Sequence, residues 1–206
     1  MKLFVTIAEE TPDAAVNTIR GVDRDHDGIE VRVERFASYE PVVFREATRK
    51  PLILTRRGAA QTADEARRAI EAGIDLVDVE YREGLKWIEP YRDRVVLSHH
   101  DFEGMPDVAH LLADMRALRC AQTKLAVTPQ NLRDNLAFLE HQRPGTTLIG
   151  MGERGLYSRI LAPFLGSELA FVSADERAAA PGQLTLERNP DADFRCPILP
   201  ARGHGS

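Results

Sequence analysis

Short runs of β-branched and aliphatic residues recur along the chain and alternate with stretches of helical periodicity. Between the runs lie helix-like segments such as 62–73, where Thr62 is a predicted N-cap and Gly73 a predicted C-terminal stop. Strands that alternate with helices predict βαβ units, and eight of them predict a compact, closed (β/α)₈ barrel with short loops. The eight predicted strands are residues 2–7, 29–34, 51–55, 75–81, 94–100, 122–127, 146–151 and 168–173.

Several of these strands carry charges on one face only, although parallel strands under helices are usually apolar on both faces. In 29–34 the odd positions are isoleucine and valine, whereas the even positions are Glu30, Arg32 and Glu34. The continuous apolar faces must pack on the helices, so the charged faces point into the barrel. This phase predicts an inward-facing set of side chains, with one arginine just beyond the third strand: Glu30, Arg32, Glu80, His100, Lys124 and Arg57.

Opposite charges inside a barrel have two explanations. They can simply neutralise one another in a buried salt-bridge network, because an unpaired buried charge is costly. A lysine, a histidine, carboxylates and arginines that converge at the carboxyl ends of barrel strands favour an active site instead. We expect desolvation and neighbouring cations to lower the pKa of Lys124 and make it a nucleophile toward carbonyls. His100, the inward member of the pair His99–His100, is suited to moving a proton, and Glu80 could hold its other nitrogen.

Composition narrows the class of protein. The chain has 206 residues, a net charge of −5 and 43% hydrophobic residues, which predicts one catalytic domain over 1–186. The proline- and glycine-rich stretch 187–206 predicts an irregular tail. The charge argues against nucleic acid as a partner, and no apolar run is long enough to span a membrane. Cys120 and Cys196 form no disulfide framework or metal-ligand spacing, so we expect a reducing, cytoplasmic compartment.

Six short stretches form an ordered set along the chain: "EVRVE" (30–34), "VDVEY" (77–81), "SHHDF" (98–102), "TKLAVTP" (123–129), "MGERGLYSRI" (151–160) and "APGQ" (180–183). In this order they resemble the type I 3-dehydroquinate dehydratases. The resemblance covers about residues 2–186 and implies a (β/α)₈ barrel and a lyase of the shikimate pathway. Such an enzyme converts 3-dehydroquinate to 3-dehydroshikimate, a step of chorismate and aromatic amino acid biosynthesis, and uses no metal or cofactor. Relatives of this kind are commonly homodimers.

The resemblance also implies a role for each residue of the predicted site. Lys124 would form the imine, His100 would act as general acid and base, and Glu80 would orient His100. The chain departs from many family members at Ala179, which cannot donate the hydrogen bond of the serine found there in relatives. A glycine-bearing acidic loop after the third strand is also replaced, by "GAAQTADEA". Substrate hydroxyls and carboxylate would be bound by the remaining residues, the last of them on a lid: Glu30, Arg32, Arg57, Arg159 and Gln183.

Two other functions fit parts of the sequence. The stretch "GMGERG" (150–155) is a literal GxGxxG between a strand and a helix, with Asp175 as a possible ribose-binding acid. This pattern is typical of a dinucleotide-binding oxidoreductase, but only about one further strand follows, and that fold needs a longer βαβαβ run. The other alternative is a repurposed, non-catalytic barrel that binds an anionic metabolite. Ala179 and the replaced loop favour it, whereas the intact Lys124 and His100 argue against it.

Overall fold

All eight hydrophobic runs predicted as strands form strands in the computed structural model of the chain. The structure describes residues 1–22, 25–58, 62–82, 84–161, 164–175, 180 and 182–185. The strands are β1 (Lys2–Ile7), β2 (Gly28–Arg32), β3 (Leu52–Thr55), β4 (Leu76–Glu80), β5 (Val95–His100), β6 (Gln122–Val127), β7 (Thr146–Gly150) and β8 (Leu169–Ser173). The α-helices are α1 (Pro12–Gly21), α2 (Val42–Ala47), α3 (Ala63–Glu71), α4 (Val108–Ala117), α5 (Leu132–Leu139) and α6 (Leu156–Leu161). Two segments form 3₁₀ helices, η1 (Leu85–Arg94) and η2 (Glu153–Gly155).

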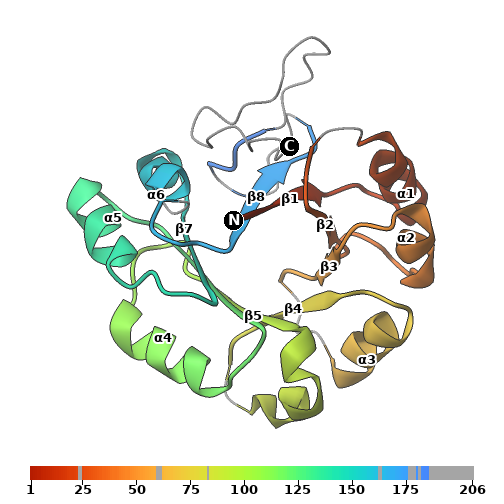
Figure 1. Ribbon diagram of the computed structural model, residues 1–206, viewed down its shortest axis with the longest axis horizontal. Helices are drawn as coiled ribbons and strands as arrows, with labels where there is room; N and C mark the ends of the chain where they lie inside the picture. Colours follow the sequence, from red (N-terminus) through yellow and green to blue (C-terminus); the bar gives the residue numbers. More distant parts are fainter. Residues whose placement is uncertain are drawn as a thin grey trace, which may run out of the picture.

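The strands form a ring with the helices on its outside (Figure 1). Each strand from β1 to β6 pairs in parallel with the next along the chain, and β1 also pairs with β8, which gives the order β7-β6-β5-β4-β3-β2-β1-β8. The predicted (β/α)₈ barrel is therefore confirmed as a nearly closed barrel. Among the described strands the ring is nearly rather than fully closed, because β7 and β8 are the two ends of the sheet. The end of β8 pairs instead with a later segment, since Ser173 bridges to Thr185.

The two faces of the strands bury different side chains, as the alternation predicts. On β6, Leu125 and Val127 pack with Phe138 of α5 in the layer between sheet and helices. Lys124 and Ala126 have the opposite phase, and Ala126 belongs to the apolar cluster inside the barrel. That inner cluster consists of Phe4, Ile53, Val96, Ala126, Ile149, Met151, Leu169 and Phe171. Its ring of apolar side chains gives the charged inward residues a water-poor surrounding, which strengthens their interactions.

Helix α3 begins and ends where the sequence predicts. The Thr62 hydroxyl accepts a hydrogen bond from the Glu65 backbone N–H, and the Glu65 carboxylate accepts one from the Thr62 backbone N–H, forming a capping box. Gly73 follows the helix with a φ of +87°, a left-handed conformation that glycine adopts without strain. The predicted tail, 187–206, lies outside the described residues. None of the helices in the described ranges is long and apolar enough to cross a membrane.

The glycines of the GxGxxG stretch serve a packing purpose. A Cβ on Gly155 would lie 2.3 Å from the carbonyl carbon of Gly150, and a Cβ on Gly150 would lie 2.7 Å from the Cα of Gly155. The Ser158 hydroxyl joins the same contact, because it accepts from the Gly150 N–H at 2.5 Å and donates to the Gly155 carbonyl at 2.8 Å. Close approach of the end of β7 to η2 therefore requires both glycines, without any dinucleotide.

We expect Gly155→Ala to destabilise the protein by about 1–3 kcal/mol, because the new methyl group overlaps backbone that cannot move aside. The measurement is urea unfolding followed by circular dichroism. Gly21→Ala is the matched control, since a Cβ at this helical position would meet nothing within 4 Å. Equal unfolding midpoints for the two variants would show that the contact between the glycines is not tight.

Candidate active site

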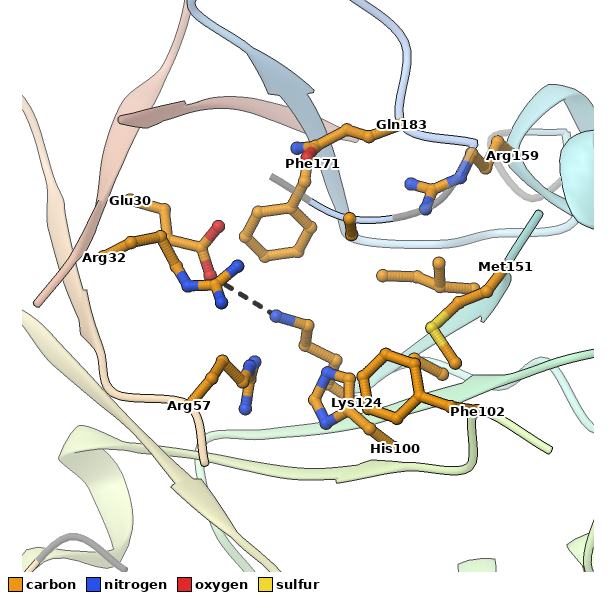
Figure 2. A pocket seen from close by; sticks show the side chains of 13 residues that line it. Glu30, Arg32, Arg57, His100, Phe102, Lys124, Met151, Arg159, Phe171 and Gln183 are labelled. Carbon is orange, nitrogen blue, oxygen red and sulfur yellow. Dashed lines mark hydrogen bonds and ion pairs between the residues drawn. The ribbon is translucent and has the colours of Figure 1, made fainter. Parts of the chain in front are cut away.

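One pocket lies among the carboxyl ends of the strands, and it encloses about 590 Å³ including its open mouth. Figure 2 shows Lys124 near its centre, with Glu30 and Arg32 on one side and Phe102 and Met151 on the other. Glu80 does not line the pocket itself but contacts His100. Ala179 lies outside the described residues. The other predicted site residues all line the pocket: Glu30, Arg32, Arg57, His100, Lys124, Arg159 and Gln183.

The Lys124 amine lies between two carboxylates. Its side chain comes from the inward face of β6, and the residue is only 5% exposed. Nζ lies 3.2 Å from Asp78 Oδ2 and 3.4 Å from Glu30 Oε1, the latter contact being the dashed line in Figure 2. It also lies 4.3 Å from the centre of the Phe171 ring, a cation–π contact. The sequence predicted cations around this lysine, whereas its ion pairs are with carboxylates.

His100 is held by Glu80 through two contacts. Its Nδ1 lies 2.8 Å from Glu80 Oε2, and its backbone N–H donates to Oε1 at 2.8 Å. Burial lowers the pKa of His100 below its usual 6.5, although Glu80 acts to raise it, so the imidazole is neutral at pH 7. With Nδ1–H donating to Glu80, the lone pair of the neutral ring is on Nε2. The Phe102 ring stacks on the imidazole with centroids 6.2 Å apart.

The guanidinium group of Arg57 points at carboxylates inside the barrel. Its two terminal nitrogens each lie 2.8 Å from an oxygen of Asp78, and Nη1 also lies 3.2 Å from Glu80 Oε2. Burial disfavours the guanidinium charge, but Asp78, Glu30 and Glu80 outweigh it and raise the pKa of Arg57. The sequence assigned this fork to a substrate carboxylate, whereas the structure pairs it with Asp78.

Asp78 is the residue of this site that the sequence analysis did not select. It lies on β4 two residues before Glu80, has the same inward phase, and is 1% exposed. Burial opposes its ionised form, but Arg57 and Lys124 hold its pKa far below the usual range. The Ser98 hydroxyl also donates to Oδ1 at 2.5 Å. The alternation that selected Glu80 contains Asp78 as well, so the signal was present in the sequence.

Glu30 is bound mainly by hydroxyl groups. Thr6 donates to Oε2 at 2.7 Å and Thr55 donates to Oε1 at 2.8 Å. Burial raises the pKa of Glu30, but Lys124 and Arg32 outweigh it, so the pKa lies below its usual value. The side-chain amide of Gln183 donates to Thr6 at 2.9 Å, so this residue reaches the pocket across 177 positions of sequence.

Two further arginines line the pocket. Arg32 forms an ion pair with Glu34, and Arg159 projects from α6 (Figure 2). Burial lowers the pKa of Arg159 to about 10. An anion bound against this guanidinium offsets the desolvation cost of its charge, because opposite charges attract strongly where water is sparse.

Comparison with known proteins identifies the family. The family model described as type I 3-dehydroquinase matches residues 3–189. The chain belongs to the type I 3-dehydroquinase family. Its members are hydro-lyases, so the chain is an enzyme of this class, and the resemblance drawn from the six short stretches is confirmed.

The relatives agree in sequence and in fold. The 3-dehydroquinate dehydratase of Methanothermobacter thermautotrophicus is 30% identical over 209 residues, which cover 90% of this chain and 93% of that protein. That of Escherichia coli O8 is 30% identical over 203 residues and 80% of each chain. A crystal structure of the type I enzyme from Clostridium difficile, with covalent modified comenic acid, superposes with a TM-score of 0.77 at 26% identity, covering 89% of this chain and 87% of that one.

We expect Glu80→Gln to lower the pKa of His100 further. The carboxylate stabilises the imidazolium form, and glutamine has a similar shape without the charge. The measurement is an NMR titration of the histidine ring signals. The ring signals of exposed His110, which contacts Asp114 at 3.5 Å, are the internal control and should be unchanged by the substitution. A pKa of His100 that rises or stays constant would contradict the assigned contact.

Proposed function

We propose that the chain is a 3-dehydroquinate dehydratase that converts 3-dehydroquinate to 3-dehydroshikimate and water through an imine on Lys124. The observation that carries the proposal is the presence of the Lys124 amine and the His100 ring in one charged pocket of a family member. In this function the protein would serve the shikimate pathway and hence chorismate and aromatic amino acid biosynthesis. We also infer from the family resemblance that it is a cytoplasmic homodimer.

The proposed chemistry uses the amine and the imidazole in turn. Lys124 attacks the ring ketone, and loss of water leaves an iminium that withdraws electrons from the neighbouring carbon. His100, neutral at pH 7, removes the proton from that carbon and then protonates the departing hydroxyl. Water then hydrolyses the imine and releases the product. The covalent modified comenic acid in the Clostridium difficile relative supports a covalent step of this kind.

The rest of the pocket is suited to a polyhydroxylated carboxylate. Arg159 offers a guanidinium that can grip a carboxylate in a fork, and its partial burial makes an anionic partner favourable. Glu30 and Arg32 lie on the opposite side, within reach of ring hydroxyls (Figure 2). Gln183, which is 9% exposed, would hold the lid segment over the ligand. Arg57 then supports the site from behind, because its fork is engaged by Asp78.

We expect borohydride, added with substrate or product, to fix the mass of the ligand covalently on the peptide that contains Lys124. Reduction converts the iminium to a stable secondary amine, and peptide mass spectrometry locates it. Lys124→Ala should abolish both trapping and turnover. The matched control is Lys50→Ala, because the Lys50 amine contacts His26 outside the pocket. Label on another lysine, or an active enzyme without label, would overturn the mechanism.

We expect His100→Ala to retain trapping on Lys124 while kcat falls by about 10²–10⁴-fold or more, the usual effect of removing a general acid and base. Imine formation depends mainly on the amine, whereas the elimination needs the proton carrier. His99→Ala is the matched control and should have a mild effect, since His99 lies on the other face of β5, with its Nδ1 3.7 Å from Glu80. Equal losses in the two variants, with unchanged thermal stability, would refute this division between the histidines.

The same measurements separate the proposed function from a repurposed barrel that only binds an anionic metabolite. The dehydration product contains a conjugated enone, which absorbs in the ultraviolet, so turnover appears as rising absorbance. A barrel that only binds the substrate would give no such signal and no borohydride label. The guanidinium groups of Arg32 and Arg159 suit either function, whereas the Lys124 amine and the His100 ring together supply what the dehydration needs.

A further inference from the structure

Asp78 contacts the amine of Lys124 without lining the pocket. Both of its oxygens are held in place: Oδ1 accepts from Arg57 and Ser98, and Oδ2 accepts from Arg57 and Lys124. The two Arg57 contacts, each 2.8 Å long, form a bidentate pair, which is the strongest arrangement of this kind in proteins. The carboxylate therefore has neither the freedom nor the open coordination to bind a substrate. Its position serves the lysine.

From this geometry we propose that Asp78 is a catalytic counter-ion of Lys124. It remains ionised throughout the reaction and stabilises the positive charge that Nζ carries, first as an ammonium and then as an iminium. The inference rests on the proposed imine mechanism. It assigns a role to a residue that the family resemblance did not bring into the predicted site.

The condensation step conserves both protons and charge, which is why a permanent anion suits it. The ammonium gives up one proton, and the freed electron pair on nitrogen forms a bond to the ketone carbon. The carbonyl oxygen receives two protons in all, equal in number to those lost from nitrogen, and leaves as water. Nitrogen keeps one proton and the positive charge in the C=N bond. Nζ is neutral in the attacking amine and in the carbinolamine, and it becomes positive again as water leaves. An anion fixed 3.2 Å away therefore stabilises the developing iminium relative to the neutral species that precede it.

The neighbouring carboxylate has different surroundings and suits a different task. Glu30 is held by the hydroxyls of Thr6 and Thr55, whereas Asp78 is held by both terminal nitrogens of Arg57. A carboxylate in a bidentate guanidinium pair is a poor proton acceptor, because the cation favours its ionised form. Glu30, 3.4 Å from Nζ, is therefore the better acceptor for a proton leaving the ammonium, and Asp78 supplies constant charge.

Asp78 also connects the amine to the general base. The Arg57 nitrogen that contacts Asp78 Oδ1 also lies 3.2 Å from Glu80 Oε2, the oxygen that holds His100. Loss of the Asp78 charge would leave Arg57 with Glu80 as its remaining close carboxylate, and would draw Glu80 away from the imidazole. The counter-ion thus fixes the relative positions of the two groups that act on the substrate.

Two substitutions separate charge from shape. Asp78→Asn keeps the shape and removes the charge, whereas Asp78→Glu keeps the charge and changes the shape. The readouts are the rate at which borohydride traps ligand on Lys124 in timed quench experiments, together with kcat and KM. For Asp78→Asn we expect trapping and kcat to fall by about 10²-fold, with KM within about threefold, as for loss of one charge stabilising a reacting centre. Asp78→Glu should trap at least about tenfold faster than Asp78→Asn, whereas a packing role predicts the reverse order.

The matched control is Asp75→Asn, three residues earlier in the chain. Asp75 pairs with Arg45 at 2.9 Å and accepts from the Leu52 N–H, outside the pocket, so its loss should leave the trapping rate unchanged. If Asp78→Asn matches the wild type while the wild type turns over and traps, the counter-ion role is wrong and the proposed function stands. If the wild type forms neither product nor label, the proposed function itself fails. If Asp78→Asn does not melt cooperatively, Asp78→Glu decides, and trapping below about one tenth of the wild-type rate overturns the role.

Discussion

The charges of Glu30, Lys124, Asp78, Arg57 and Glu80 inside this barrel are tolerated because each contacts an opposite charge or a hydroxyl group. A buried ion without such partners would cost several kcal/mol or would give up its charge. The contacts form one connected network, so each member depends on the next. Moving one side chain would leave its neighbour unpaired, which makes the network a rigid unit rather than a set of independent bonds. From the segment after β8 to the end of β5 the members are Gln183, Thr6, Glu30, Lys124, Asp78, Arg57, Glu80 and His100.

The register of the strands is what assembles this network. Thr6 pairs with Glu30, Thr55 with Asp78, and Ser98 with both Glu80 and Lys124. Each charged side chain therefore has a hydroxyl residue beside it on the next strand. A shift of any strand by one residue would turn its charges toward the helices and its apolar face into the barrel. The same register that buries the core thus fixes the geometry of the candidate site.

Much of this could be predicted from alternation within single strands. The eight strands, the inward phase of Lys124 and His100, and the cap of α3 at Thr62 all follow from local pattern, and the structure agrees with each. The alternation carries no information about distances between side chains across the barrel. Threonines and serines are ordinary strand residues, so nothing local distinguishes Thr6, which serves as a ligand of Glu30.

The missing information about distances across the barrel also explains where the structure differs from the predictions. We expected cations around Lys124 because arginines share the inward phase. Which charged group lies nearest to Nζ, however, depends on side-chain length and on how many strands separate the two residues, and in the structure these groups are carboxylates. Closure of the ring was expected from the number of strands. In the structure Ser173, at the end of β8, pairs with Thr185, and no periodic pattern in the sequence predicts this pairing.

The bond between Gln183 and Thr6 joins nearly opposite ends of the barrel sequence. Thr6 lies on β1, and Gln183 follows β8. Contacts of such long sequence separation form slowly, because the intervening chain must be ordered first. The pocket is therefore completed only when the segment at Gln183 docks on β1, so any change that slows this docking delays the assembly of the whole pocket.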